Sequence, residues 1–161
     1  MFVRLNNAHP FREGNGRTQR EFITQLARQA GHLLDFTVVS QERMIVASYD
    51  GLQGDASTMR RLFDEISDPA RTALLYKATS ILDTEGVAWR GMYFASAQPE
   101  RDYTGRVAIY GPGVFIMDSG VNVIAGQAKD LTDEARASGG QLITLTASPY
   151  NEGDDFQHQR Q

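Results

Sequence analysis

The chain has 161 residues, of which 41% are hydrophobic, and it contains no cysteine. That length and apolar fraction suffice for a buried core in one or two small domains, whereas the lack of cysteine excludes disulfides and thiolate metal sites. The formal net charge of −4 gives no electrostatic basis for binding nucleic acid. No apolar run approaches the ~20 residues that span a bilayer, and no basic, apolar leader opens the sequence. We therefore expect a cytoplasmic protein without a membrane partner.

Residues 2–8 are typical of the end of a helix, and they lead into the run His9–Arg20, which reads HPFREGNGRTQR. Because further chain normally precedes a site of this kind, we expect Met1 to be an internal methionine of a longer protein or a misassigned start. His9 is the one proton acceptor of the run whose pKa ordinarily lies near neutrality, so it is the candidate base for an attacking hydroxyl. Glu13 offers hard oxygen ligands, which suit Mg²⁺.

A turn of three residues stands before the next predicted helix: Gly14, Asn15 and Gly16. Such a turn adopts backbone angles that other residues avoid, and it points free N–H groups at one spot at the positive end of the helix dipole. The helix is predicted over Thr18–Ala30. Arg17 and Arg20 lie on one face of its first turn, where cations oppose the dipole but suit phosphate oxygens. Each feature alone is typical of an ordinary loop or a solvated helix face. Together they predict a site for a nucleotide's phosphates and metal.

Three more helices are predicted before residue 85. The first, Ser40–Gly51, has Ser40 as its N-cap, and the second, Asp55–Ser67, has apolar residues at i, i+3, i+4 and i+7. Asp68-Pro69 is a strong start signal for the third, which runs to about Thr84. Their apolar stripes indicate a helical core rather than a cofactor site.

From Trp89 onward the pattern changes to short stretches rich in β-branched and aromatic residues. Five strands are predicted: Met92–Ala97, Tyr103–Tyr110, Val114–Met117, Val121–Ala125 and Gln141–Ala147. A short helix is expected over Thr132–Ala137. Five strands with one short helix are typical of an OB-fold, so the predicted fold class is α+β, with helices followed by a small five-stranded OB-like β-barrel. The few basic residues over 89–150 argue against nucleic acid as its ligand.

The run His9–Arg20 resembles the signature of the Fic family, His-x-Phe-x-Asp/Glu-Gly-Asn-Gly-Arg-x-x-Arg, and matches it at every defined position. Most Fic proteins transfer AMP from ATP to a Ser, Thr or Tyr hydroxyl of a target protein, and a minority transfer other phosphate-containing groups. The resemblance therefore implies an enzyme, a protein adenylyltransferase that uses ATP and Mg²⁺.

The resemblance also implies a role for each motif residue. His9 is the general base, Glu13 binds Mg²⁺ between the α- and β-phosphates, and Phe11 packs into the core. The remaining residues bind phosphates: Gly14, Asn15 and Gly16 form the anion hole for the α-phosphate, and Arg17 and Arg20 hold the β- and γ-phosphates.

The order of helices and strands resembles that of type IV secretion effectors in which an OB-like domain follows a Fic domain, here with both ends missing. We expect the C-terminal part of a Fic domain over 1–86, an OB-like domain over 87–150 and a polar tail over 151–161. In this arrangement the full-length form would be delivered to the cytoplasm of a host or recipient cell.

Many Fic proteins are inhibited by a helix with the pattern Ser/Thr-x-x-x-Glu-Gly/Asn, which Ser148–Gly153 matches loosely. The family precedent for a chain without an internal inhibitor is a missing upstream segment or an antitoxin-like partner. Because the helices before the motif and the hairpin that clamps the target are expected to be missing, a second function stays open. In that alternative the chain is a catalytically incomplete fragment, an interaction module or a remnant.

Overall fold

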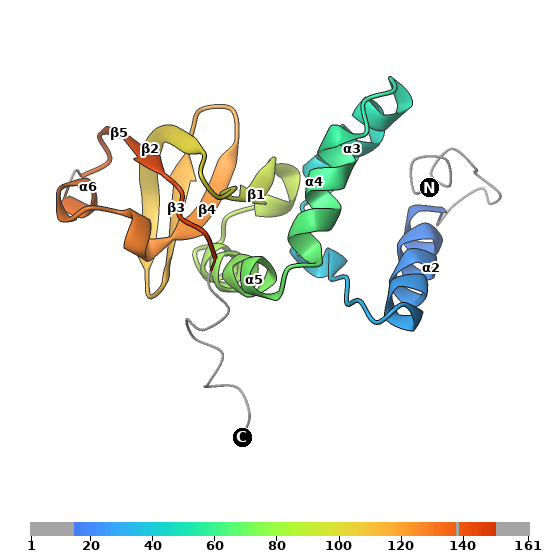
Figure 1. Ribbon diagram of the computed structural model, residues 1–161. Helices are drawn as coiled ribbons and strands as arrows, with labels where there is room; N and C mark the ends of the chain where they lie inside the picture. Colours follow the sequence, from blue (N-terminus) through green and yellow to red (C-terminus); the bar gives the residue numbers. More distant parts are fainter. Residues whose placement is uncertain (1–14, 138, 151–161) are drawn as a thin grey trace.

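The computed structural model describes residues 15–137 and 139–150 of the chain. Figure 1 shows helices followed by a sheet, which confirms the α+β class. The expectations for residues 1–14 and 151–161, including the helix end before the motif and the polar tail, lie outside the described residues. Within the described ranges, no helix is both long and apolar enough to cross a membrane.

Four long helices form the first part of the described chain: α2 (Asn15–Gln29), α3 (Gln41–Leu52), α4 (Ser57–Ile66) and α5 (Pro69–Thr84). Both N-caps expected from the sequence are confirmed. The Ser40 side chain accepts a hydrogen bond from a backbone N–H of the first turn of α3 at 3.2 Å, and Asp68 does the same for Ala70 N of α5 at 2.9 Å. Helix α4 begins later than expected, because the Asp55 carboxylate accepts from Ser57 N at 2.8 Å in the turn before the helix.

Five strands form one sheet: β1 (Phe94–Ser96), β2 (Asp102–Gly111), β3 (Val114–Asp118), β4 (Val123–Gln127) and β5 (Leu142–Thr146). Their order is β1-β4-β3-β2-β5, with β1 parallel to β4 and all other neighbouring pairs antiparallel. The 3-10 turn η3 (Ala128–Asp130) and the short helix α6 (Asp133–Ala137) lie between β4 and β5. Each predicted strand is therefore present, as is the predicted short helix.

The OB-like barrel, however, is not closed, because β1 and β5 are the two edges of an open sheet. Closure would require β1 to pair with β5 as well as with β4. Strand β1 has three residues, and the chain after it contains Pro99, which has no N–H to donate. The next residue, Glu100, has a φ of 61°, in the left-handed region. The chain thus turns away before β1 is long enough to support a second ladder.

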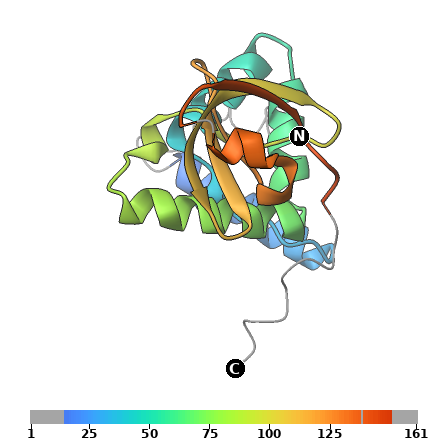
Figure 2. The same ribbon diagram turned by 90° about the vertical axis from the view of Figure 1, so that its left-hand side faces the viewer.

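One buried core joins the helices to the sheet. Leu62 of α4, Leu75 of α5 and Phe94 of β1 belong to the same cluster of buried side chains. Figure 2 shows α5, in green, running beneath the strands, and Figure 1 shows α2 on the far side of α3 and α4 from the sheet. Ile23 is the residue that α2 contributes to this core. Because the core extends on both sides of residue 87, the division into two domains there stays a prediction.

Candidate functional site

Helix α2 carries the last part of the predicted phosphate site. It begins at Asn15, three residues before the expected start at Thr18, so Gly16 belongs to the first helical turn rather than to a separate turn before it. Arg17 and Arg20 follow within the first two turns. The structure therefore brings four predicted phosphate-binding residues together at one end of one helix.

The other predicted site residues lie outside the described residues: His9, Phe11, Glu13 and Gly14. Over 15–137 and 139–150, no group of three or more His, Cys, Asp or Glu side chains is placed to hold a metal ion. The loosely matching inhibitory segment is described as far as Tyr150. Its Ser148 lies beside β4, where Gln127 Nε2 donates to the Ser148 carbonyl at 3.1 Å, whereas Glu152 lies outside the described residues.

The guanidinium of Arg20 lies back along α2, beside its first turn. A Cβ placed on Gly16 would be 3.4 Å from Arg20 Nη1, so a glycine at this position leaves the cation room next to the helix start. Arg20 is half-buried and Arg17 is exposed, and the first turn contains no acidic residue. The positive end of the helix dipole and two arginines thus place positive charge at one end of α2, where a phosphate would be stabilised.

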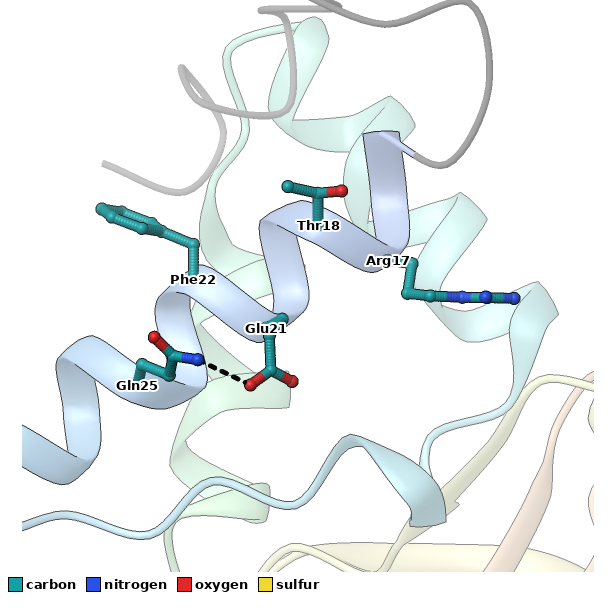
Figure 3. A pocket seen from close by; sticks show the side chains of 5 residues that line it. All are labelled: Arg17, Thr18, Glu21, Phe22 and Gln25. Atoms are coloured by element: carbon teal, nitrogen blue, oxygen red, sulfur yellow. Dashed lines mark hydrogen bonds between the residues drawn. The ribbon is translucent and has the colours of Figure 1, made fainter.

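An open hollow of about 430 Å³ lies along the same helix. Its described lining residues all come from α2 and are drawn in Figure 3: Arg17, Thr18, Glu21, Phe22 and Gln25. Figure 3 shows Thr18 and Phe22 pointing to one side of the helix and Arg17 to the other. Gln25 Nε2 donates to Glu21 Oε1 at 2.9 Å, and 52% of Phe22 is exposed. The described lining of the hollow thus combines one exposed aromatic side chain with polar groups, and it lies along the helix whose first turn carries Arg17.

Thr18, Glu21 and Gln25 were not among the predicted site residues, because polar residues on an amphipathic helix are typical of a solvated face. The exposure of Phe22 also differs from what its helical spacing predicts. Helical spacing groups it with Ile23 and other apolar residues of α2, yet Ile23 is 8% exposed and Phe22 52%. An aromatic side chain next to an arginine-bearing helix start was therefore the one signal that could have indicated this hollow.

The chain is similar to known proteins, although no family model matches it. A protein adenylyltransferase of Bartonella henselae is 36% identical over 155 residues, which cover 94% of this chain and 28% of that protein. A probable protein adenylyltransferase Fic of Salmonella typhimurium is 37% identical over 70 residues, 44% of this chain and 35% of that protein. Among solved structures, the type IV secretion system effector protein BepA matches with a TM-score of 0.84 and 36% identity, over 93% of this chain and 52% of that chain.

The chain thus spans 28% of its Bartonella henselae relative and about half of the BepA structure. The similarity to both extends over helices and strands alike, since it covers 94% and 93% of this chain. The unbroken signature His9–Arg20 and these similarities together show that the chain belongs to the Fic family.

Proposed function

We propose that this chain is part of a protein adenylyltransferase, which transfers AMP from ATP to a Ser, Thr or Tyr hydroxyl of a target protein. The observation that carries the proposal is the cationic start of α2, where Arg20 Nη1 lies beside Gly16 and Arg17 extends from the same turn. Such a site favours phosphates over neutral ligands. The name of the Bartonella henselae relative, protein adenylyltransferase, supports the same reaction.

In the proposed reaction, the oxygen of the target hydroxyl attacks the α-phosphorus of ATP. His9 accepts the hydroxyl proton as the new oxygen–phosphorus bond forms, and the bond from the α-phosphorus to the bridging oxygen breaks, so that pyrophosphate leaves. The backbone N–H groups of Gly14–Gly16 stabilise the charge on the α-phosphate. Arg17 and Arg20 hold the β- and γ-phosphates, which become the leaving group.

Glu13 is the residue proposed to hold Mg²⁺. Its carboxylate is a hard oxygen ligand, and an ion of this kind is commonly bound by one carboxylate together with phosphate oxygens and water. The first turn of α2 has no acidic residue, so it offers phosphates cations and N–H groups while the carboxylate comes from the preceding segment. When bound, the ion would neutralise charge on the α- and β-phosphates.

The target is proposed to be another protein, because the relatives are named protein adenylyltransferases. The likeness to a type IV secretion system effector supports delivery of a full-length form into the cytoplasm of a host or recipient cell. Transfer of a different phosphate-linked group on the same scaffold would be detected by replacing ATP with other nucleotides.

A second candidate is an interaction module without catalysis, and the exposed apolar side chains of two helices favour it. Phe22 and Leu26 of α2 are 52% and 40% exposed, and Ile45 and Tyr49 of α3 are 52% and 61% exposed. Apolar side chains at i and i+4 on a helix are typical of a surface that receives another helix. An antitoxin-like inhibitor is one partner of that kind.

Transfer of label from α-labelled ATP in the presence of Mg²⁺ and cell lysate distinguishes the two candidates. We expect covalently labelled protein with the parent chain, no label with His9→Ala, and a loss of about 100-fold with Arg20→Ala, which removes a phosphate ligand. Arg28→Ala is the matched control, because Arg28 is exposed and lies in the last turn of the same helix. Label that persists in His9→Ala would contradict the mechanism, and no label from any protein would favour the interaction module.

A further inference from the structure

A group of buried charged and polar side chains lies between the helices and the sheet, and none of them is a proposed phosphate-binding residue. It is called here the Glu65 cluster and consists of Arg43 of α3, Glu65 of α4, Arg71 of α5 and Ser96 of β1, each less than 9% exposed. Glu65 Oε1 accepts a hydrogen bond from Arg43 Nη1. Glu65 Oε2 accepts from Arg71 Nη2 at 3.3 Å and from Ser96 Oγ at 2.6 Å. Four elements that are separate in the sequence therefore meet at one carboxylate.

Residues 147–150, called here the closing segment, follow β5 and end beside α5 (Figure 1). The ring of Tyr150 has its centroid 6.0 Å from Arg71 Cζ, and the Tyr150 hydroxyl donates to Ala97 O, directly after β1, at 2.8 Å. Ser148 N donates to a carboxylate oxygen of η3 at 3.2 Å. Burial raises the pKa of Tyr150, so its phenol stays a hydrogen-bond donor at neutral pH. The closing segment thus contacts both Arg71 and the chain that follows β1.

The charges of the Glu65 cluster make its geometry restrictive. Two guanidinium groups share one carboxylate in the buried interior, where an ion is costly unless its hydrogen bonds are satisfied. The aromatic face of Tyr150 gives Arg71 a further favourable contact. Apolar cores accept many combinations of side chains, whereas the directional hydrogen bonds of this cluster form at one relative position of the helices and β1. Among the described residues Arg43 Nε has no hydrogen-bond partner, so the cluster has no bond to spare. Buried ionic groups of this kind are better suited to fixing one arrangement than to adding stability.

We propose that the closing segment controls how the sheet docks on the helices. Tyr150, seated over Arg71, keeps the hydrogen bonds of the Glu65 cluster in their one arrangement, and removing Tyr150 loosens β1 and α4 together. This conformational coupling is independent of the proposed enzymatic activity.

Amide hydrogen exchange on the full chain tests the coupling, because it reports local opening element by element. With Tyr150→Ala we expect exchange to rise about tenfold in β1 and α4 as well as in the closing segment. Tyr150→Phe keeps the ring over Arg71 and should give a smaller rise. Tyr110→Ala is the matched control, since the Tyr110 ring also faces an arginine, 5.4 Å from Arg136 Cζ, but is 51% exposed. Its effect should stay within β2 and α6, and a Tyr150→Ala effect confined to residues 147–150 would overturn the proposal.

A second set of variants tests whether the coupling passes through the charges. The combined replacement Arg43→Met, Glu65→Leu and Arg71→Met removes all the ions at similar volume, and such exchanges often leave stability unchanged or higher. In this background, adding Tyr150→Ala should no longer change exchange in β1 and α4, as expected when two perturbations share one path. An equal rise in both backgrounds would show that Tyr150 acts without the Glu65 cluster and would refute the proposal.

Discussion

Replacement of Gly126 of β4 by alanine is expected to destabilise the protein through one contact, with the ring of Phe115 on β3. The two residues are cross-strand partners, and a Cβ at position 126 would lie 2.2 Å from Phe115 Cζ and 2.4 Å from its Cε1. Because carbon atoms pack at about 3.5–4.0 Å, the ring would have to move by about 1 Å or more. Phe115 is 1% exposed and packs against Met117 and Leu145, so the neighbours must move with it. Overpacking of this kind costs about 1–3 kcal/mol, and we expect the upper part of that range.

Urea unfolding, followed by Trp89 emission and by far-UV circular dichroism, measures the change in the free energy of unfolding. Gly91→Ala is the control, because a Cβ there meets nothing within 4 Å and the residue has no positive φ; its effect should stay within about 0.5 kcal/mol. Phe115→Leu should recover part of the loss in the Gly126→Ala background, since a smaller side chain leaves space for the new methyl group. A Gly126→Ala protein as stable as its parent, or two substitutions whose costs simply add, would refute the steric reasoning.

Two further predictions concern α5. Leu75 is fully buried in the core shared by helices and sheet, so Leu75→Ala should lower the free energy of unfolding by about 2–5 kcal/mol. The control is Leu52→Ala, because the Leu52 side chain is 55% exposed and its loss should change that free energy by no more than about 0.5 kcal/mol. Equal effects of the two substitutions in urea unfolding would argue against the shared core. The hydrogen bond from Trp89 Nε1, with Arg90 beside it, lowers the pKa of the Asp83 carboxyl below its ordinary 3.8. Ionised Asp83 therefore stabilises the folded state above that pH, and the contribution is lost as pH falls through the lower folded-state pKa. Asp83→Asn should reduce the acid dependence of the urea midpoint, and identical pH profiles for variant and parent would contradict this.

Local chemistry explains why the helices were predictable from the sequence. Ser40 and Asp68-Pro69 are start signals whose mechanism is a hydrogen bond to the next turn, and the structure contains both bonds. The gathering of Gly16, Arg17 and Arg20 at the start of α2, the proposed phosphate site, was predictable because these residues lie within a few positions of one another. The start of α2 at Asn15 was not, because glycine permits both a turn and a helical residue, and its sequence does not favour one of them.

The pairing of strands that are distant in the sequence has no local signal comparable to a helix N-cap. Period-two alternation predicts a strand but not its neighbour, so nothing in Phe94–Ser96 indicates that it pairs in parallel with β4 and leaves the sheet open. The predicted barrel was therefore an inference from strand count, and strand count is the same for an open sheet and a closed one.

Glu65 presents the same difficulty for single charged residues. In the sequence it stands beside an apolar stripe that includes Leu62 and Ile66, where a carboxylate is ordinarily read as the solvated edge of an amphipathic helix. Its burial depends on Arg43, 22 residues earlier, and on Ser96, 31 residues later, and neither spacing has a local signature. A buried charge is tolerated only when such distant partners arrive together. The contacts that restrict this fold most are consequently those with the least local signal. Tyr150 and Glu65 lie in segments that were predicted to belong to different domains. A Tyr150→Ala effect that reaches α4 would therefore show that the two segments form one structural unit.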